Sequence, residues 1–476
     1  MNLKLVYSKI KIKSEIVVTG SKSETNRLLL LQALFPQISL KNTSNSDDSE
    51  VMIEILNDFN QSKNQIPPLG VRGHDVHHAG TAMRFLTAYF AIQPNQEVIL
   101  TGSSRMKERP MHVLVEALNS LGAQISYEEK AGFPPIRIKG KDLNKNEIAI
   151  EANTSSQFIS ALLLIAPKLK NGLKLNLKGE ITSLPYIKMT LTLLKKVGVE
   201  SSFENNIITV KPRTYNPQPA TYNLQPTTDN LQPITVVVES DWSSASYFYS
   251  IVALSEIGTR ISLSSYKKES LQGDAILSEI YNDFGVKTVF NENDSITISK
   301  VNDSINVNGN DNGNFNSSKN LEPRTDNLQP RTYNSQPRAN NGQLKYNLNN
   351  APDIAQTIAV TCFGLGIGCY LSGLHTLKIK ETDRLAALKN ELEKLGAAIS
   401  VTDDSLHLKP AKKDFVISKN VSIATYQDHR MAMAFAPLAL KTSLVIENAE
   451  VVSKSYPGFW ADLKSIGFKM DETTAL

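Results

Sequence analysis

The feature that most restricts the fold of this 476-residue chain is a helix pattern that recurs six times. Each copy has apolar residues at helical spacing, and five copies end in glycine, which is typical of a left-handed C-terminal cap. A short strand pattern follows each one. With two insertions set aside, the period is roughly 60–75 residues, long enough for a repeated helix-and-strand unit. The segments are 49–60, 109–123, 185–199, 273–286, 381–397 and 456–468, and the glycines are Gly122, Gly198, Gly285, Gly396 and Gly467.

A second, more apolar helix type alternates with the first. Its copies begin with small residues or with Ser, Thr and Asp, which satisfy the free amides at a helix start. The copies are 21–34, 79–90, 154–166, 240–254, 351–363 and 427–440. Helices that are apolar all round are buried. Six buried and six amphipathic helices therefore predict an α/β protein built from six copies of one unit, three in each of two domains.

Two segments interrupt this pattern with a seven-residue repeat of their own. Residues 213–233 read RTYNPQP-ATYNLQP-TTDNLQP, and residues 324–337 repeat the unit as RTDNLQP-RTYNSQP. Both are rich in Asn, Gln, Pro and Thr, so they bury too little apolar surface to offset the loss of backbone entropy. We predict two disordered surface insertions without a catalytic role, at about 212–234 and about 301–343.

Composition excludes several classes of function. The net charge of +4 is small for this length and argues against a dedicated nucleic-acid binder. The N-terminus alternates like a strand and lacks the apolar core of a signal peptide, and no apolar run favours a membrane span. Cys362 and Cys369 form no disulfide framework, and we expect a cytoplasmic protein. The HDVHH stretch lacks acidic or cysteine partners at a recognised spacing, so we expect no metal site.

Cations and hydroxyls gather at the predicted helix starts. A helix start presents free N–H groups and the positive end of a dipole, and it therefore binds anions. A single charged residue at a helix start is usually a solvated surface residue. Here most of the predicted buried helices begin with cations or hydroxyls, which favours a shared binding role. The residues are Lys22, Ser23, Arg27, Gly80, Thr81, Arg84, Ser155, Ser156, Gln157, His429 and Arg430, joined by Arg109, Lys380, Arg384 and Lys454 from the amphipathic segments. We predict a site that holds several phosphate and carboxylate groups.

Two carboxylates lie among these cations. Asp353 opens a buried helix, and Glu381 stands beside Lys380 and three residues before Arg384. An acid surrounded by cations stays ionised or shares a proton with its neighbours, which suits proton transfer. The alternatives are a helix cap for Asp353 and an ordinary ion pair between Glu381 and Arg384.

A set of motifs in a fixed order resembles a known family over nearly the whole chain outside the insertions. The motifs are SKSETNR, AGTAMRF, LTGSSRMKERPM, SSQFISALLL, SLPYI, SDWSSASYF, IKETDRL, QDHRMAM and SKSYPGFW. Together they resemble the 5-enolpyruvylshikimate-3-phosphate synthase family of enolpyruvyl transferases. The resemblance implies a two-domain inside-out α/β barrel with three βαβαββ repeats per domain. It places one lobe at 21–238, the other at 1–20 plus 239–476, and the active site in the cleft between them.

The resemblance also implies two sets of binding residues. Shikimate 3-phosphate would be held by Lys22, Ser23, Arg27, Ser155, Ser156, Gln157, Ser183, Tyr186, Asp353 and Lys380. Phosphoenolpyruvate would be held by Lys22, Gly80, Arg109, Gln157, Arg384, Arg430 and Lys454. Asp353 would be the base for the 5-hydroxyl and Glu381 the proton carrier at C3, with Lys22 and Lys454 assisting and His429 close by. No cofactor is implied, and we expect a monomer that binds these two metabolites alone.

The chain departs from the family pattern at three positions. His78 replaces the usual Asn before AGTAMR, Phe85 the usual Pro after AMR, and Thr376 an Asn upstream of KETDR. The nearest alternative is the sister enzyme that uses UDP-N-acetylglucosamine, whose mobile loop carries a Cys in the first-half domain; this chain has no Cys before Cys362. A lapsed anion-binding scaffold is a second alternative, and joint retention of Lys22, Asp353, Glu381 and Lys454 argues against it. An enzyme acting on nucleic-acid ends is a third, disfavoured by the low net charge.

Overall fold

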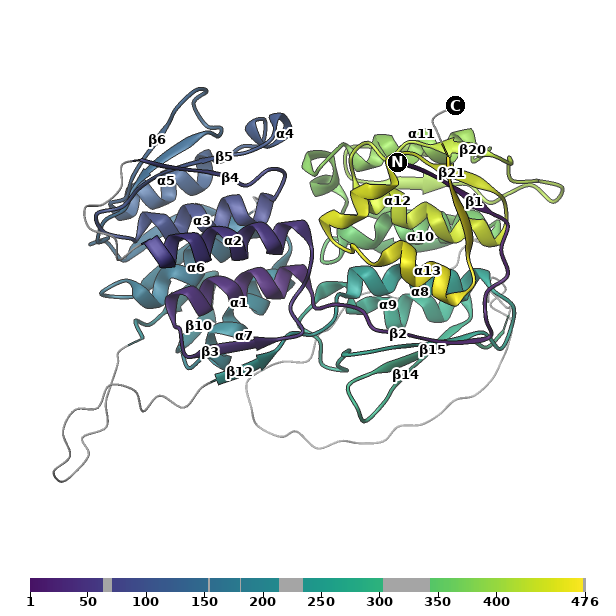
Figure 1. The fold of residues 1–476 in the computed structure, drawn as a ribbon, viewed down its shortest axis with the longest axis horizontal. Helices are drawn as coiled ribbons and strands as arrows, with labels where there is room; N and C mark the ends of the chain where they lie inside the picture. The colour runs from purple at the N-terminus through teal and green to yellow at the C-terminus, as the bar shows by residue number, and fades with distance from the viewer. Residues whose placement is uncertain (63–70, 153–154, 180, 214–233, 303–342, 474–476) are drawn as a thin grey trace.

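The computed structural model describes residues 1–62, 71–152, 155–179, 181–213, 234–302 and 343–473. It is an α/β structure in which helices lie between small sheets in two lobes placed side by side (Figure 1). Six sheets are present within the described ranges. The predicted insertions fall almost entirely outside those ranges. Their proposed limits were slightly too wide, because Ile234 already belongs to strand β12 and Gln343 to strand β16.

The predicted apolar helices form the interior of each lobe. In the first lobe α3 packs on both α1 and α6, and in the second α10 packs on both α8 and α12. Nearly every residue of α3 and α8 is buried, as expected for helices that are apolar all round. The helices are α1 (Lys22–Leu34), α3 (Gly80–Ala91), α6 (Ser156–Ile165), α8 (Trp242–Leu254), α10 (Ala355–Leu365) and α12 (His429–Phe435).

The predicted amphipathic helices are also present, with one exception in form. They are α2 (Asp47–Ser62), α5 (His112–Leu121), α7 (Leu184–Lys196), α11 (Arg384–Lys394) and α13 (Phe459–Ile466), with a short α4 (Ser104–Lys107) before α5. The sixth segment is broken: α9 (Leu277–Ile280) lies between two 3-10 turns, Gly273–Ile276 and Tyr281–Phe284. All five predicted cap glycines adopt a positive φ, between 74° and 116°.

Three sheets belong to the first lobe. Their strand orders are β4-β5-β7-β6, β10-β11-β9-β8 and β12-β3. The strands are β3 (Ile38–Lys41), β4 (Arg72–Asp75), β5 (Glu97–Thr101), β6 (Gln124–Tyr127), β7 (Ile136–Lys139), β8 (Glu147–Glu151), β9 (Leu173–Lys178), β10 (Ser201–Glu204), β11 (Ile207–Val210) and β12 (Ile234–Val237). The parallel pairs β4–β5 and β8–β9 are each joined through a buried helix, which is the βαβ arrangement.

The second lobe uses both ends of the chain. Its sheets are β20-β21-β1-β22, β14-β15-β13-β2 and β16-β17-β19-β18. The strands are β1 (Asn2–Val6), β2 (Lys13–Ile16), β13 (Arg260–Leu263), β14 (Val286–Phe290), β15 (Ile296–Lys300), β16 (Gln343–Asn347), β17 (Gly368–Ser372), β18 (Ile399–Val401), β19 (Leu406–Leu408), β20 (Val421–Ile423), β21 (Leu444–Ile446) and β22 (Lys469–Thr473). Because β1 lies between β21 and β22, the N-terminal strand completes a sheet made from the C-terminal region.

Two separate hydrophobic cores correspond to the two lobes. One contains buried residues from Leu28 to Val238, and the other combines Leu3–Val18 with Trp242–Met470. The chain passes between them at Gly20 and Ser240, which form an isolated antiparallel bridge. A Cβ on Gly20 would lie 1.9 Å from the Asn42 carbonyl oxygen, so only glycine fits this crossing. Within the described part of the chain, no helix is both long and apolar enough to span a bilayer.

Candidate active site

The centre of the site is the guanidinium of Arg384, at the first residue of α11 in the second lobe. Its Nη1 donates to Asp353 Oδ1 at 2.8 Å, its Nη2 to Glu381 Oε2 at 2.6 Å and its Nε to Asp428 Oδ2 at 2.6 Å. The side chain is 2% exposed. The site therefore forms where three acids from separate segments meet one planar cation whose rigid fork matches carboxylates.

Asp353 lies within reach of three cations. Besides Arg384, Lys380 Nζ is 3.6 Å from Oδ1 and Arg430 Nη2 is 3.4 Å from Oδ2. Burial opposes ionisation of this carboxyl, but the charges of Arg430, Lys380 and Arg384 outweigh it and hold the pKa of Asp353 far below its usual range. The helix-cap alternative is wrong, because Asp353 lies inside a 3-10 turn and makes no capping hydrogen bond.

Glu381 precedes α11 and is also held as a carboxylate. Burial raises its pKa, while the charges of Arg384, Arg109 and Lys22 lower it to well below the usual range. The ion pair with Arg384 that sequence spacing offered as an alternative is present. The pair does not exclude a chemical role, since Glu381 faces cations from both lobes.

Two lysines bring the lobes together at this point. Lys22, the first residue of α1, has its Nζ 3.4 Å from the carbonyl oxygen of Lys454 and 3.8 Å from Asp48 Oδ2. Lys454 Nζ donates to the Gln427 carbonyl at 2.7 Å, immediately before the Asp428–His429–Arg430 run. The charge of Lys22 reaches Glu381 and lowers its pKa. The catalytic assignment of both lysines stays a prediction.

His429 is buried without a hydrogen-bond partner for either ring nitrogen. Its side chain is 2% exposed, and its Nδ1 lies 3.9 Å from Asp428 Oδ1. Burial, and then the charges of Lys22 and its other cationic neighbours, lower the pKa of His429 well below its usual value. The imidazole is therefore neutral and can accept or donate one hydrogen bond to a ligand.

The first lobe supplies a second group of predicted residues. Gln157 Nε2 donates to Thr81 Oγ1 at 3.0 Å, which links the starts of α6 and α3. Ser155 caps α6, and Ser183 precedes α7 with a φ of 54°. Tyr186 is a half-buried residue whose pKa is raised by burial and by the second-lobe acids Asp274 and Asp353. Tyr186 therefore lies close enough to the second-lobe acids to feel their charge, and the substrate contacts of this group stay predictions.

Arg27 is buried in the first lobe. Its Nε donates to Thr190 Oγ1 at 2.8 Å, its Nη2 to Ser160 Oγ at 2.9 Å and its Nη1 to the Ser23 carbonyl at 2.7 Å. Phe85, where the family pattern usually has proline, contacts the guanidinium face, with the carbon of the guanidinium 5.4 Å from the ring centre. Its contact with a substrate phosphate stays a prediction.

Gly80 and two arginines form the remaining part of the site. A Cβ on Gly80 would lie 2.3 Å from Arg109 Nη1, so the guanidinium of Arg109 rests directly on the glycine. Arg84 Nη1 donates to the Gly80 carbonyl at 2.9 Å. Burial lowers the pKa of both arginines, and the charge of Arg109 lowers that of Arg84 further. Two clustered cations at a helix start are suited to binding an anion.

Several residues of the site were missed by sequence reasoning. Asp428 belongs to the QDHR motif and caps α12, and Asp48 follows the acidic start of α2. Ser243 and Asp274 support Arg430: Arg430 Nη2 donates to Ser243 Oγ at 3.2 Å, and Ser243 Oγ donates to Asp274. The QDHR motif was the sequence signal that could have identified Asp428. No local signal identifies Asp274, because it reaches Arg430 only through Ser243, which lies in another segment of the chain.

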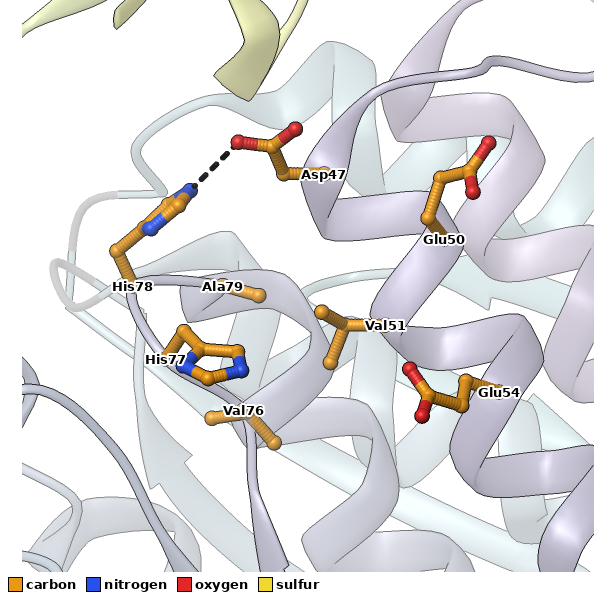
Figure 2. A pocket seen from close by; sticks show the side chains of 8 residues that line it. All are labelled: Asp47, Glu50, Val51, Glu54, Val76, His77, His78 and Ala79. Carbon is orange, nitrogen blue, oxygen red and sulfur yellow. Dashed lines mark ion pairs between the residues drawn. The ribbon is translucent and has the colours of Figure 1, made fainter.

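The histidines of HDVHH are separated by the fold. His74 stacks on Phe90, and His77 Nδ1 lies 3.7 Å from Asp75. His78 Nε2 lies 3.4 Å from Asp47 Oδ2, as Figure 2 shows. In the part of the chain that the structure describes, no group of three His, Cys, Asp or Glu side chains is placed to hold a metal ion. Thr376, the third departure from the family pattern, has a buried hydroxyl without a partner.

Comparisons with known proteins match nearly the whole chain to one family. The family model described as EPSP synthase (3-phosphoshikimate 1-carboxyvinyltransferase) matches residues 6–313 and 327–463. A 3-phosphoshikimate 1-carboxyvinyltransferase from Bacteroides fragilis (strain YCH46) is 39% identical over 467 residues, covering 98% of each chain. One from Histophilus somni (strain 2336) is 31% identical over 486 residues, covering 97% of this chain and 99% of the relative.

Solved structures support the fold. The EPSP synthase from Acinetobacter baumannii superposes with a TM-score of 0.70 at 18% identity, covering 99% of both chains. The enolpyruvyl transferase NikO from Streptomyces tendae does so with a TM-score of 0.64 at 12% identity, covering 100% of this chain and 99% of that one. The family model and the curated relatives place this two-lobed α/β chain among the enolpyruvyl transferases. The chain belongs to the EPSP synthase family, whose members are 3-phosphoshikimate 1-carboxyvinyltransferases.

Proposed function

We propose that this chain transfers the enolpyruvyl group of phosphoenolpyruvate to the 5-hydroxyl of shikimate 3-phosphate. The products are 5-enolpyruvylshikimate 3-phosphate and phosphate, on the route to chorismate and the aromatic amino acids. The observation that carries this proposal is the meeting of Arg384, Arg430 and Lys380 with Asp353 and Glu381, opposite Lys22 of the other lobe. Fixed cations of this kind stabilise charge that develops on phosphate and carboxylate groups during the reaction.

The two lobes would share the substrates. Ser23, Arg27, Ser155, Ser156, Gln157, Ser183 and Tyr186 of the first lobe would hold shikimate 3-phosphate, with Lys22 at its edge and Asp353 and Lys380 of the second lobe on its hydroxyls. Phosphoenolpyruvate would lie between Lys22, Gly80, Arg109, Gln157, Arg384, Arg430 and Lys454. We assign the lobes as domains 21–238 and 1–20 plus 239–476. We further propose a monomer in the cytoplasm.

Chemistry would proceed by addition and elimination. The 5-hydroxyl oxygen bonds to C2 of phosphoenolpyruvate, the hydroxyl proton passes to Asp353, and C3 takes a proton to become a methyl group. The C2–phosphate bond then breaks, C3 loses a proton, and the new double bond completes the enolpyruvyl ether. A carboxylate with a strongly lowered pKa is a weak base, so Asp353 first orients the hydroxyl and takes its proton as the C2–O bond forms.

Glu381 needs its substrates before it can donate a proton. In the free site the surrounding cations hold its pKa well below the usual range, so the group is ionised. A bound phosphate and carboxylate would neutralise part of that positive charge, and the pKa of Glu381 would then rise. This order couples proton delivery to substrate binding, which protects phosphoenolpyruvate from protonation in an incomplete complex.

Phosphate release tests the proposal directly. The protein is mixed with shikimate 3-phosphate and phosphoenolpyruvate, and each is omitted in turn. Phosphate should appear only when both are present. UDP-N-acetylglucosamine serves as the control acceptor, and phosphate release with that acceptor but not with shikimate 3-phosphate would reject the proposal.

A further inference from the structure

Asp47 connects the two lobes. It is the first residue of α2 in the first lobe, and its Oδ2 accepts a hydrogen bond of 2.8 Å from Ser453 Oγ in the second lobe. Ser453 belongs to the 3-10 segment Ala449–Lys454, which packs against α2. The next residue is Lys454, whose backbone carbonyl faces Lys22. This contact therefore holds the segment that carries a predicted phosphoenolpyruvate ligand.

His78 approaches the same carboxylate oxygen from another direction. Its Nε2 lies 3.4 Å from Asp47 Oδ2, and the two side chains point toward each other above a cavity of about 260 Å³ (Figure 2). His78 precedes Ala79 and Gly80, where α3 begins and Arg109 rests. One acceptor thus joins the start of α3, the start of α2 and the Lys454 segment. The His78 approach lacks hydrogen-bond geometry, whereas the Ser453 contact is a hydrogen bond. Burial raises the pKa of Asp47, but its interactions with His78 and Ser453 outweigh burial and lower the pKa.

We propose that Asp47, Ser453 and His78 form an interlobe latch that positions Lys454 and the start of α3 around phosphoenolpyruvate. The inference rests on the proposed function and deepens it. None of the three is assigned a contact with reacting atoms, so all are positioning residues. The latch gives a role to the His78 departure, which the proposed reaction leaves unexplained.

The physical basis of the latch is the population of the closed arrangement. For a ligand that binds only when the lobes are together, the apparent dissociation constant equals the intrinsic one divided by the fraction of molecules in the closed state. Lys454 is also approached from the first lobe by Lys22, whose Nζ lies 3.4 Å from the Lys454 carbonyl oxygen. The shorter Asp47–Ser453 bond, with a charged acceptor, contributes more to that fraction.

Kinetics of matched variants test the positioning. We expect Asp47→Ala and Ser453→Ala each to raise the KM for phosphoenolpyruvate by about three- to tenfold, the equivalent of one net hydrogen bond. The double variant should be no worse than either single one, because both remove the same bond. His78→Ala should act in the same direction by about twofold, since its contact is longer and part-exposed. In all of them kcat should change less than KM.

Glu50→Ala is the matched control. Glu50 is exposed and lies in the same first turn of α2 as Asp47. Its replacement by Ala therefore removes the same negative charge from the helix start. It should leave the KM for phosphoenolpyruvate unchanged. An equal effect of Glu50→Ala and Asp47→Ala would mean that the helix dipole, and not the latch, is responsible. Additive effects in the double variant would overturn the proposal as well.

Hydrogen exchange gives a readout that needs no turnover. Without substrates, the amides of residues 449–455 should exchange at least about threefold faster in Asp47→Ala and Ser453→Ala than in wild type and Glu50→Ala, because local opening becomes easier. Unchanged exchange would overturn the latch. This result does not depend on the proposed function, because the exchange is measured without substrates. Faster exchange together with an unchanged KM for phosphoenolpyruvate, in a wild type that turns over, would overturn the positioning of Lys454.

Discussion

At the scale of single residues, Arg384 decides the electrostatics of the site. It is almost fully buried, and the acids that it joins come from three segments: Asp353, Glu381 and Asp428. Burial lowers the pKa of Arg384, but these acids outweigh it and raise the pKa above its usual value. A buried cation that holds three carboxylates acts on stability as well as on ligand binding.

Arg384→Ala should therefore destabilise the fold, beyond the loss of phosphoenolpyruvate affinity that its assignment implies. We expect a loss of about 3–5 kcal/mol in the free energy of unfolding at neutral pH, since buried acids are left uncompensated. In wild type the lowered pKa of Asp353 and Glu381 stabilises the fold above their unfolded pKa, and that contribution is lost as pH falls. The difference between variant and wild type should accordingly shrink toward acidic pH.

Denaturant titrations at two pH values measure this difference. Arg384→Lys keeps the charge without the planar fork and should show an intermediate loss. A variant with wild-type stability and only weaker phosphoenolpyruvate binding would contradict the structural role.

Glu381→Gln separates chemistry from binding. The amide keeps the shape and one acceptor but cannot carry a proton, so turnover should fall by about 10²–10⁴-fold, the usual contribution of general acid–base catalysis. Binding of phosphoenolpyruvate should change much less. Single-turnover rates measure the effect, and rates within about threefold of wild type would reject the proton-transfer role.

At the scale of elements, the two chain crossings form a network around buried acids. The Glu239 amide donates to Glu24 Oε2 at 3.3 Å, and Glu239 Oε1 accepts from Trp242 Nε1 at 2.9 Å. Burial, opposed by Lys196 and reinforced by the charge of Glu239, raises the pKa of Glu24 to about 7. An acid of this kind makes the junction of α1, β12 and α8 sensitive to pH.

Glu24→Gln should remove that sensitivity. Because the folded pKa of Glu24 is raised, the folded state binds its proton more tightly, and stability falls as pH rises from about 4.5 to about 7. The variant should therefore match wild type near pH 4.5 and exceed it at pH 8 by up to about 3 kcal/mol. Denaturant titrations across this range measure the difference, with the exposed Glu15→Gln as control. A variant less stable than wild type at pH 8 would show that Glu24 is needed in its charged form.

The same elements show what sequence reasoning can reach. Helical periodicity and cap glycines predicted the helices, because both signals lie within a dozen residues; Gly122 and Gly467 are examples. The segment 273–286 was predicted as one helix but is broken into short turns. Its start is closely packed against distant residues, since a Cβ on Gly273 would lie 2.4 Å from the Asn350 carbonyl oxygen and 3.3 Å from Pro185. Periodicity within the segment contains no information on those neighbours.

The residues of the site also divide into those that a local sequence pattern indicates and those that it does not. Asp353, Glu381 and Arg384 were found because charged residues stand at predicted helix starts. The partner of Arg384 at Asp428 lies 44 residues away, and that of Asp47 at Ser453 lies 406 residues away. Such pairs depend on how sheets and lobes assemble, and a single sequence does not encode them as a local pattern.

At the scale of the whole molecule, the substrates themselves would connect the lobes. The lobes have separate cores, and the chain crosses between them at two adjacent points. Proposed ligands of shikimate 3-phosphate lie on both sides, from Gln157 and Tyr186 to Asp353 and Lys380. A ligand held by both lobes adds a link that the chain alone lacks, so binding should change how the two cores unfold relative to each other.

Calorimetry can detect this coupling. Two cores joined by few contacts should unfold without ligand in two overlapping transitions, as multidomain proteins often do. Shikimate 3-phosphate at 100 times its dissociation constant stabilises the folded state by about 2.7 kcal/mol, and since it touches both lobes it should shift both transitions upward and merge them. Shikimate without the phosphate should do so much less, because the cations at the helix starts gain no partner. If shikimate 3-phosphate moved one transition and left the other in place, its binding groups would belong to a single lobe, and the division of the site between Gln157 and Asp353 would be wrong.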